Sequence, residues 1–122
     1  MLLLNKEKVD VAFDYHESGV NDRLANMMVA HPKNIGIAAA AVLDLELDHG
    51  IALKLEPSNL DFRGLSHREW GSGTGAASFL IETPHPAMDD DSPADTDVIN
   101  DPRSPLGSRV GTHLAATLAV VN

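Results

Sequence analysis

The stretch Val9-Asp-Val-Ala-Phe-Asp-Tyr-His16 alternates apolar and polar side chains, which is the pattern of a strand with one buried face. One face would carry Val9, Val11, Phe13 and Tyr15, and the other Asp10, Ala12, Asp14 and His16. We predict a strand over 9–15 with His16 at its tip, beside the loop Glu17-Ser-Gly19. Strand tips beside loops are where α/β proteins place functional side chains, because the strand fixes the backbone and the loop admits a ligand.

Two further predicted strands also end at a carboxylate. One spans 77–81 and ends at Glu82-Thr-Pro84, and the other spans 51–55 and ends at Glu56-Pro57. At the end of an apolar strand, Glu82 would stand in partly desolvated surroundings, where a raised pKa makes a carboxylate a useful general base. The alternative is a strand-end acid in a salt bridge. Glu56 occupies a similar position, so the pattern alone does not separate the two residues.

Helical periods alternate with these strands. Apolar positions follow the helical period over 35–47, and Gly50 stands where a C-terminal stop is expected. A shorter helix is predicted over 21–30, ended by His31-Pro32. In the last helix a stripe should pack on the sheet, and it consists of Leu106, Val110, Leu114, Leu118 and Val121.

The alternation of helices and strands predicts an α/β fold with a partial mixed sheet flanked by helices. About three strands leave the edges of the sheet poorly covered, unless another segment or subunit completes it. At 122 residues we expect one domain, 1–122, which is small for a complete α/β enzyme.

Composition excludes several classes of function. The formal net charge is −9, and six aspartates gather between Asp89 and Asp101 without a Lys or Arg among them. Such a balance argues against nucleic-acid binding, which needs clustered cations. No cysteine is present, so thiolate nucleophiles and Cys-based zinc sites are excluded. The apolar run 1–4 is too short for a membrane span, and we expect a cytoplasmic soluble protein.

The acidic residues lie in a proline-rich connection over about 84–105, which cannot be a regular element. We expect a mobile loop near the mouth of the site, because it directly follows Glu82.

The histidines do not form a helical metal pair. None of the six belongs to a His-x-x-x-His or His-x-x-Glu pattern. For His16 the alternatives are a metal ligand or a strand-end histidine bonded to a neighbouring carbonyl. We expect His31, His49 and His113 at helix ends or on the surface.

The segment 62–71 is dense in Arg, His and Ser and suits recognition of a carboxylate or acyl group, because an arginine fork pairs bidentately with an anion. Arg68 is the candidate residue. The alternative is a solvated loop in which Arg68 pairs with Glu69 or a nearby Asp.

The order of these pieces resembles the C-terminal half of the succinylglutamate desuccinylase/aspartoacylase branch of the zinc carboxypeptidase superfamily. The resemblance covers about 9–121. It is carried by Phe13-Asp-Tyr-His-Glu17, Val29-Ala-His-Pro32, Leu55-Glu-Pro-Ser58, Gly64-Leu-Ser-His-Arg-Glu69 and Phe79-Leu-Ile-Glu-Thr-Pro84.

The resemblance implies a zinc-dependent amide hydrolase, either an N-acyl amino acid deacylase or carboxypeptidase-like. His16 matches the zinc ligand at a strand end, and Glu82 matches the general base that deprotonates zinc-bound water for attack on an amide carbonyl. Arg68 is the counterpart, more loosely, of an arginine that binds the substrate carboxylate. The implied ligand is an N-acyl amino acid or a peptide C-terminus.

The chain departs from the family because it has no His-x-x-Glu pair, which the family's N-terminal half supplies. A catalytic zinc normally takes three protein ligands. The chain is therefore expected to be a partial catalytic domain completed by more chain or by a partner, or else a non-catalytic binding or scaffold module that self-associates through its sheet edges.

Overall fold

The computed structural model describes residues 6–61 and 65–122, and contains one four-stranded mixed sheet. Its strands are β1 (Val11–Gly19), β2 (Met27–Ala30), β3 (Lys54–Pro57) and β4 (Ala77–His85), in the order β1-β4-β2-β3. The pairs β1·β4 and β2·β3 are parallel, and β2·β4 is antiparallel. The apolar run 1–4 and the first residues of the polar segment, 62–64, lie outside the described residues.

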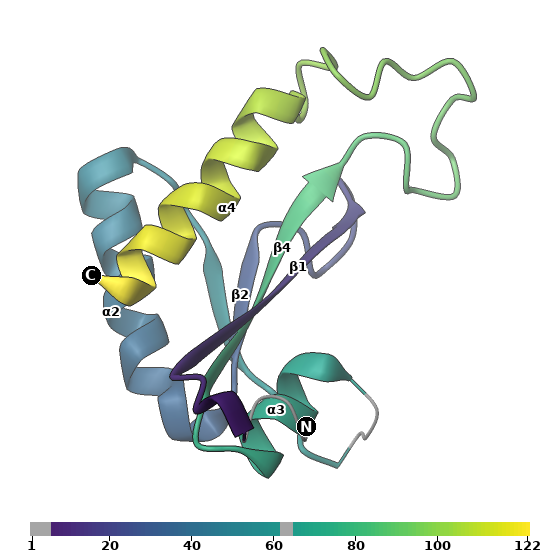
Figure 1. Ribbon diagram of the computed structural model, residues 1–122. Coiled ribbons are helices and arrows are strands. Elements are labelled where there is room, and N and C mark those ends of the chain that lie inside the picture. Colours follow the sequence, from purple (N-terminus) through teal and green to yellow (C-terminus); the bar gives the residue numbers. More distant parts are fainter. Residues whose placement is uncertain (1–5, 62–64) are drawn as a thin grey trace.

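Helices cover both faces of the sheet. α2 (Ile35–His49) and α4 (Leu106–Val121) lie together on one face, and α3 (Ser66–Gly73) lies on the other (Figure 1). A 3-10 turn, η1 (Pro32–Asn34), leads into α2. The main core lies between the sheet and the α2–α4 layer, and its fully buried large side chains include Met28, Leu45, Phe79 and Ile81. The predicted α/β class with a mixed sheet flanked by helices is confirmed.

The end of α2 is as the sequence predicts. Gly50 caps the helix in the left-handed conformation, with φ of 64°, and its N–H bonds back to Glu46. Glycine reaches this conformation without a steric cost, so it ends a helix cleanly.

The predicted helix over 21–30 is wrong, because Met27–Ala30 form β2, one of the two inner strands of the sheet. All four residues are buried, with β4 on one side and β3 on the other. Met and Ala favour helices locally, yet a short apolar run between covered faces gains more from pairing inside a sheet. Asn26, at φ of 55°, turns the chain directly before the strand.

The predicted strands have the right location but the wrong ends. β1 and β4 each run beyond the expected tip, so His16 and Glu82 lie inside strands rather than at their ends. The third strand begins at Lys54 instead of residue 51, because the backbone ladder to β2 starts where Lys54 N–H bonds the carbonyl of Asn26.

Pro84 fits inside β4 because of where β2 stops. The backbone N–H of Ala77 points toward β1 and donates to the carbonyl of Asp10, whereas the carbonyl of Ser78 points toward β2 and accepts from the N–H of His31. Backbone polar groups alternate in direction along a strand, so those of Pro84 point toward the side of β2. The β2·β4 ladder already ends at the pair Met27 and Glu82. The missing N–H of Pro84 therefore falls where β2 no longer needs a donor.

The expected packing of the α4 stripe on the sheet is wrong. Leu106, Val110, Leu114, Leu118 and Val121 are 40% to 61% exposed. The helix instead turns Arg109 and Ala116 inward, where both are buried. Polar contacts decide this rotation, because Arg109 bonds Glu17 of β1 at 2.8 Å and His113 bonds Thr83 of β4 at 3.0 Å.

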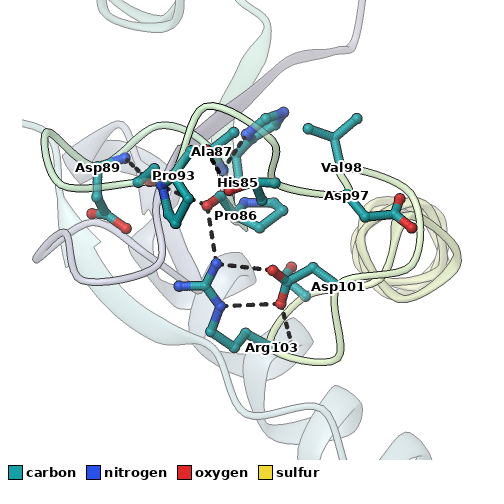
Figure 2. Close-up of polar contacts among 12 residues, drawn as sticks. His85, Pro86, Ala87, Asp89, Pro93, Asp97, Val98, Asp101 and Arg103 are labelled. Carbon is teal, nitrogen blue, oxygen red and sulfur yellow. Dashed lines mark hydrogen bonds and ion pairs between the residues drawn. The ribbon is translucent and has the colours of Figure 1, made fainter.

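The acidic connection is irregular, as predicted, and several contacts tie it down. Asp89 accepts from the backbone N–H of Asn21 at 3.2 Å, and Ser104 Oγ donates to the carbonyl of Pro84 at 2.6 Å. Figure 2 shows the guanidinium group of Arg103, which donates hydrogen bonds to both carboxylate oxygens of Asp101 and to the carbonyl of Pro86. No helix among the described residues has both the length and the apolar character needed to cross a bilayer.

Candidate functional site

His16 and Glu82 are direct neighbours in the sheet. They form one register pair of the parallel strands β1 and β4, so their side chains leave the same face of the sheet. That face is the one covered by α3, and it carries a cavity of about 620 Å³. Arg68 of α3 lines the same cavity, so all three residues singled out in the sequence meet in one place.

Glu82 is held in an electrostatically unfavourable position. The residue is only 6% exposed, and its Oε2 atom has no hydrogen-bond partner among the described residues. Desolvation raises the pKa of the Glu82 carboxyl; the neighbouring His16 offsets part of that rise, whereas Asp22 and Asp14 add to it. A carboxylate in such surroundings takes up a proton more readily than one in water.

His16 is the more accessible partner of the pair, with 55% of its side chain exposed. Its Nε2 lies 3.2 Å from Oδ1 of Asp14, two residues earlier on the same face of β1. The other carboxylate oxygen of Asp14 accepts a short hydrogen bond from Oγ of Ser66, the first residue of α3. His16 therefore stands at the end of a polar chain that starts in α3.

The first turn of α3 forms one wall of the cavity. His67 is 1% exposed, and its buried Nε2 has no hydrogen-bond partner in the part of the chain that is described. Desolvation, with a smaller contribution from Arg68, lowers the pKa of His67 to about 4, so its imidazole is neutral at neutral pH. Arg68 follows it and is half-buried in the cavity wall. The turn is fixed to the sheet because Ser78 Oγ donates to the carbonyl of His67 at 2.5 Å.

Glu56 takes a different role from Glu82, although their sequence patterns are alike. Its side chain is 41% exposed and pairs with Arg23 at 2.7 Å on the rim of the cavity. The salt-bridge interpretation thus applies to Glu56, whereas none of the ion pairs within the described ranges involves Glu82.

Sequence reasoning gave Asp14 no role, and it named Ser66 and His67 only as members of the polar segment 62–71, although all three line the cavity. The alternation that placed His16 also placed Asp14 on its face, so that residue could have been found. Ser66 and His67 depend on where α3 docks, which no local pattern reveals.

His31 and His49 stand at helix ends, as expected, because His31 is the N-cap of η1 and His49 is the last residue of α2. The expectation is wrong for His113. His31 is buried and bonds Ser72 Oγ through Nε2 at 3.0 Å. His113 lies in the middle of α4, half-buried against the edge of the Tyr15 ring.

The described lining of the cavity does not form a metal site by itself. No group of three or more His, Cys, Asp or Glu side chains arranged to hold a metal occurs within 6–61 and 65–122. One exposed imidazole with a carboxylate behind it fits a single ligand position. The described residues thus do not fit a complete catalytic zinc site, which takes three protein ligands.

Comparison of the chain with protein-family models, with curated proteins and with solved structures gives no match.

Proposed function

We propose that this chain forms the base-bearing half of a zinc-dependent amide hydrolase, of the N-acyl amino acid deacylase or carboxypeptidase-like type. The observation that carries the proposal is the register pair of His16 and Glu82, which puts an imidazole and a desolvated carboxylate side by side in one cavity. The resemblance of the sequence motifs to the zinc carboxypeptidase superfamily, over about 9–121, supports the same reaction class.

Glu82 is the general base of the proposed reaction. Its raised pKa suits it to take a proton from an attacking water and to pass that proton to the leaving amine. The β1 and β4 backbones fix its distance from His16, because both residues lie within paired strands.

Arg68 is the substrate-binding residue of the proposal. A guanidinium group in the wall of the cavity can pair with the carboxylate of an N-acyl amino acid or of a peptide C-terminus. The buried apolar side chains beside it, Leu80 and Val29, would exclude water from the scissile amide.

His16 supplies one zinc ligand in this proposal. Zinc, when bound, contributes Lewis acidity and lowers the pKa of a bound water. The remaining ligands must come from residues other than those described, either from further chain or from a partner. The proposal therefore concerns the complete assembly.

The test uses the chain together with a zinc-binding complement, either an in-frame extension or a co-expressed partner. Zinc content and hydrolysis of N-acyl amino acids are measured for the wild type and for Glu82→Gln. We expect the substitution to abolish turnover while zinc content stays the same. A matched variant, Glu56→Gln, should keep most of the activity, because Glu56 is a partly exposed residue on the rim of the cavity that pairs with Arg23. Equal activity of the wild type and Glu82→Gln would end the proposal.

A second candidate function is a binding or scaffold module that self-associates. It is favoured by the bare apolar stripe of α4 and by the outer position of β1 in the sheet. Sedimentation velocity distinguishes the two functions: a stable self-associated form that neither binds zinc nor hydrolyses amides would favour the scaffold.

A further inference from the structure

A groove of about 440 Å³ lies between α4 and the end of α2, on the face of the sheet opposite α3. Figure 1 shows α4 lying beside α2 over this face of the sheet. α4 lines the groove with Leu114 and Leu118, which are 61% and 57% exposed. Both belong to the apolar stripe of α4 and stand one turn apart. Contiguous aliphatic side chains left in water mark a surface that another apolar group can cover.

The opposite wall of the groove is acidic. Asp44 and Asp48 of α2 line it, and both are exposed. They stand four residues apart on one side of the helix, an arrangement in which like charges destabilise a helix. Within 6–61 and 65–122, neither carboxylate takes part in an ion pair. α2 also ends here, and the C-terminal end of a helix carries a partial negative charge. The wall therefore attracts a cation from outside the described residues.

Charge decides which occupant fits the groove. α2 contains no Lys or Arg, and the single Arg of α4, Arg109, is 4% exposed. A second copy docked groove to groove would bring the Asp44 and Asp48 side chains of both molecules together, in a chain whose net charge is already −9. Anionic lipid headgroups would meet the same repulsion. A segment that carries both apolar and cationic side chains complements both walls.

We propose that the groove between α2 and α4 docks a basic amphipathic helix of a partner protein. Apolar side chains of that helix cover Leu114 and Leu118, and its Lys or Arg side chains pair with Asp44 and Asp48. Each wall repeats its side chains after one helical turn, which is also the interval at which a docked helix repeats its own. Exposed ion pairs are weak, so apolar contact supplies most of the affinity and charge selects the partner.

This docking surface is independent of the proposed hydrolase, because the groove and the cavity of His16 and Glu82 lie on opposite faces of the sheet. Neither the zinc content nor the turnover of a completed enzyme enters its test.

The first experiment measures the fluorescence anisotropy of three labelled synthetic peptides of about 18 residues, or roughly five helical turns. The first peptide has a leucine face with two lysines beside it, one turn apart. The second has glutamates in place of these lysines, and the third has the composition of the first in an order without an apolar face. We expect only the first to bind, with an affinity that falls as salt is added. Equal binding of the first and third peptides would overturn the proposal.

The acidic wall is tested by the double substitution Asp44→Asn and Asp48→Asn. Binding of the basic peptide should weaken by up to about 25-fold, because each exposed ion pair contributes up to roughly fivefold. The dependence on salt should flatten as well. The matched control is Asp91→Asn with Asp95→Asn, which makes the same change of charge at the same spacing between two exposed residues of the acidic connection. An equal loss of affinity in both double variants would overturn the proposal.

The apolar wall is tested by Leu118→Gln, which should weaken binding by about 10-fold or more. Leu60→Gln is its control, because Leu60 is 43% exposed and lies outside the groove. Amide shifts caused by the basic peptide should map to 44–49 and 111–119. Shifts centred on the acidic connection would contradict the docking site. A dimer that Leu118→Gln dissociates in sedimentation velocity, or binding to phosphatidylglycerol vesicles that it abolishes, would overturn the proposal by assigning the groove to a second copy or to a membrane.

Discussion

Gly71 lies directly against the imidazole of His31. A Cβ added to Gly71 would stand 2.5 Å from Cδ2 of His31 and 2.9 Å from its Cβ. Atoms so close to the backbone of His31 cannot swing away, so the contact requires glycine at this point of α3. The close approach sets how α3 lies on the sheet, and with it the place of Ser66 and Arg68 in the cavity.

Gly71→Ala should therefore destabilise the protein by about 1–3 kcal/mol, the usual cost of overpacking. Urea unfolding measures the change. Gly111→Ala is the matched control, because Gly111 is also helical and its Cβ would meet nothing within 4 Å. The control should gain roughly 0.5–1 kcal/mol from helix propensity alone. The same sign for both substitutions would contradict the contact with His31.

Glu82→Gln should stabilise the fold at neutral pH while it removes the base. The pKa of Glu82 is raised, so its charged form is disfavoured in the folded state and stability contributed by this group falls as the pH rises above 4.5. Gln has the same shape without the charge. We expect a higher free energy of unfolding for the variant at pH 7, because the substitution removes the desolvation cost of the buried charge.

The gain from Glu82→Gln should shrink as the pH falls toward 4.5 and stay small below it, where glutamate is protonated in both the folded and the unfolded state. Thermal unfolding of the wild type and the variant at pH 7 and pH 4 provides the comparison. A variant less stable than the wild type at pH 7 would show that the carboxylate is better solvated than its burial implies.

His67 should make the fold sensitive to mild acid. Its pKa is lowered from 6.5 to about 4, so between these values the unfolded chain binds a proton that the folded chain does not. Stability from this group is thus complete above pH 6.5 and is lost as the pH falls toward 4. At roughly 1.4 kcal/mol for each pKa unit, the loss amounts to about 3 kcal/mol.

Urea midpoints of the wild type and of His67→Gln between pH 7 and pH 4.5 test this pH dependence. The variant should be less stable at pH 7 but should lose less stability on acidification. Parallel curves for the two proteins would assign the acid sensitivity to other groups.

Arg109→Met should loosen the acidic connection. Arg109 is 4% exposed and joins Glu17 of β1 at 2.8 Å to the carbonyl of Val98, so its loss leaves both acceptors without that donor. A cost of about 1–3 kcal/mol is expected from the unpaired groups. Amide hydrogen exchange over 86–105 should accelerate.

Arg103→Met is the comparison for Arg109→Met, because the Arg103 side chain is 47% exposed and its ion pair with Asp101 lies near solvent. Its effect on stability should stay below about 1 kcal/mol, as for other exposed pairs. If the two substitutions accelerate exchange equally, Arg109 is not the main anchor of the loop.

The sequence predicted well wherever one local pattern decided the structure. The alternation around Phe13 placed Asp14 and His16 on one face of β1, and Gly50 ended α2 where a stop was expected. The sequence-based prediction failed where contacts between distant residues determine the structure. The segment 27–30 is a strand because it pairs with β4 and β3. The face that α4 turns toward the sheet is set by the hydrogen bonds of Arg109 and His113.

The candidate site divides in the same way. His16 and Glu82 could be found because each lies beside an apolar strand segment. That they are partners across one ladder depends on β4 pairing with β1 rather than with β3, which is a property of the topology.

The chain combines an exposed apolar stripe on α4 with a strongly acidic connection. α4 contains only Arg109 and His113 as ionisable residues, and both turn inward, so its exposed side chains carry no charge. The aspartates within 89–101 carry negative charge, and the resulting repulsion between molecules opposes their association through this apolar surface. Backbone N–H groups of Asn100 and Ile99 hold the pKa of Asp97 below its ordinary value, so this part of the charge survives further into acid. Concentrated salt would screen the aspartates and strengthen apolar contact at the same time, so molecules salted out of solution should meet first through α4.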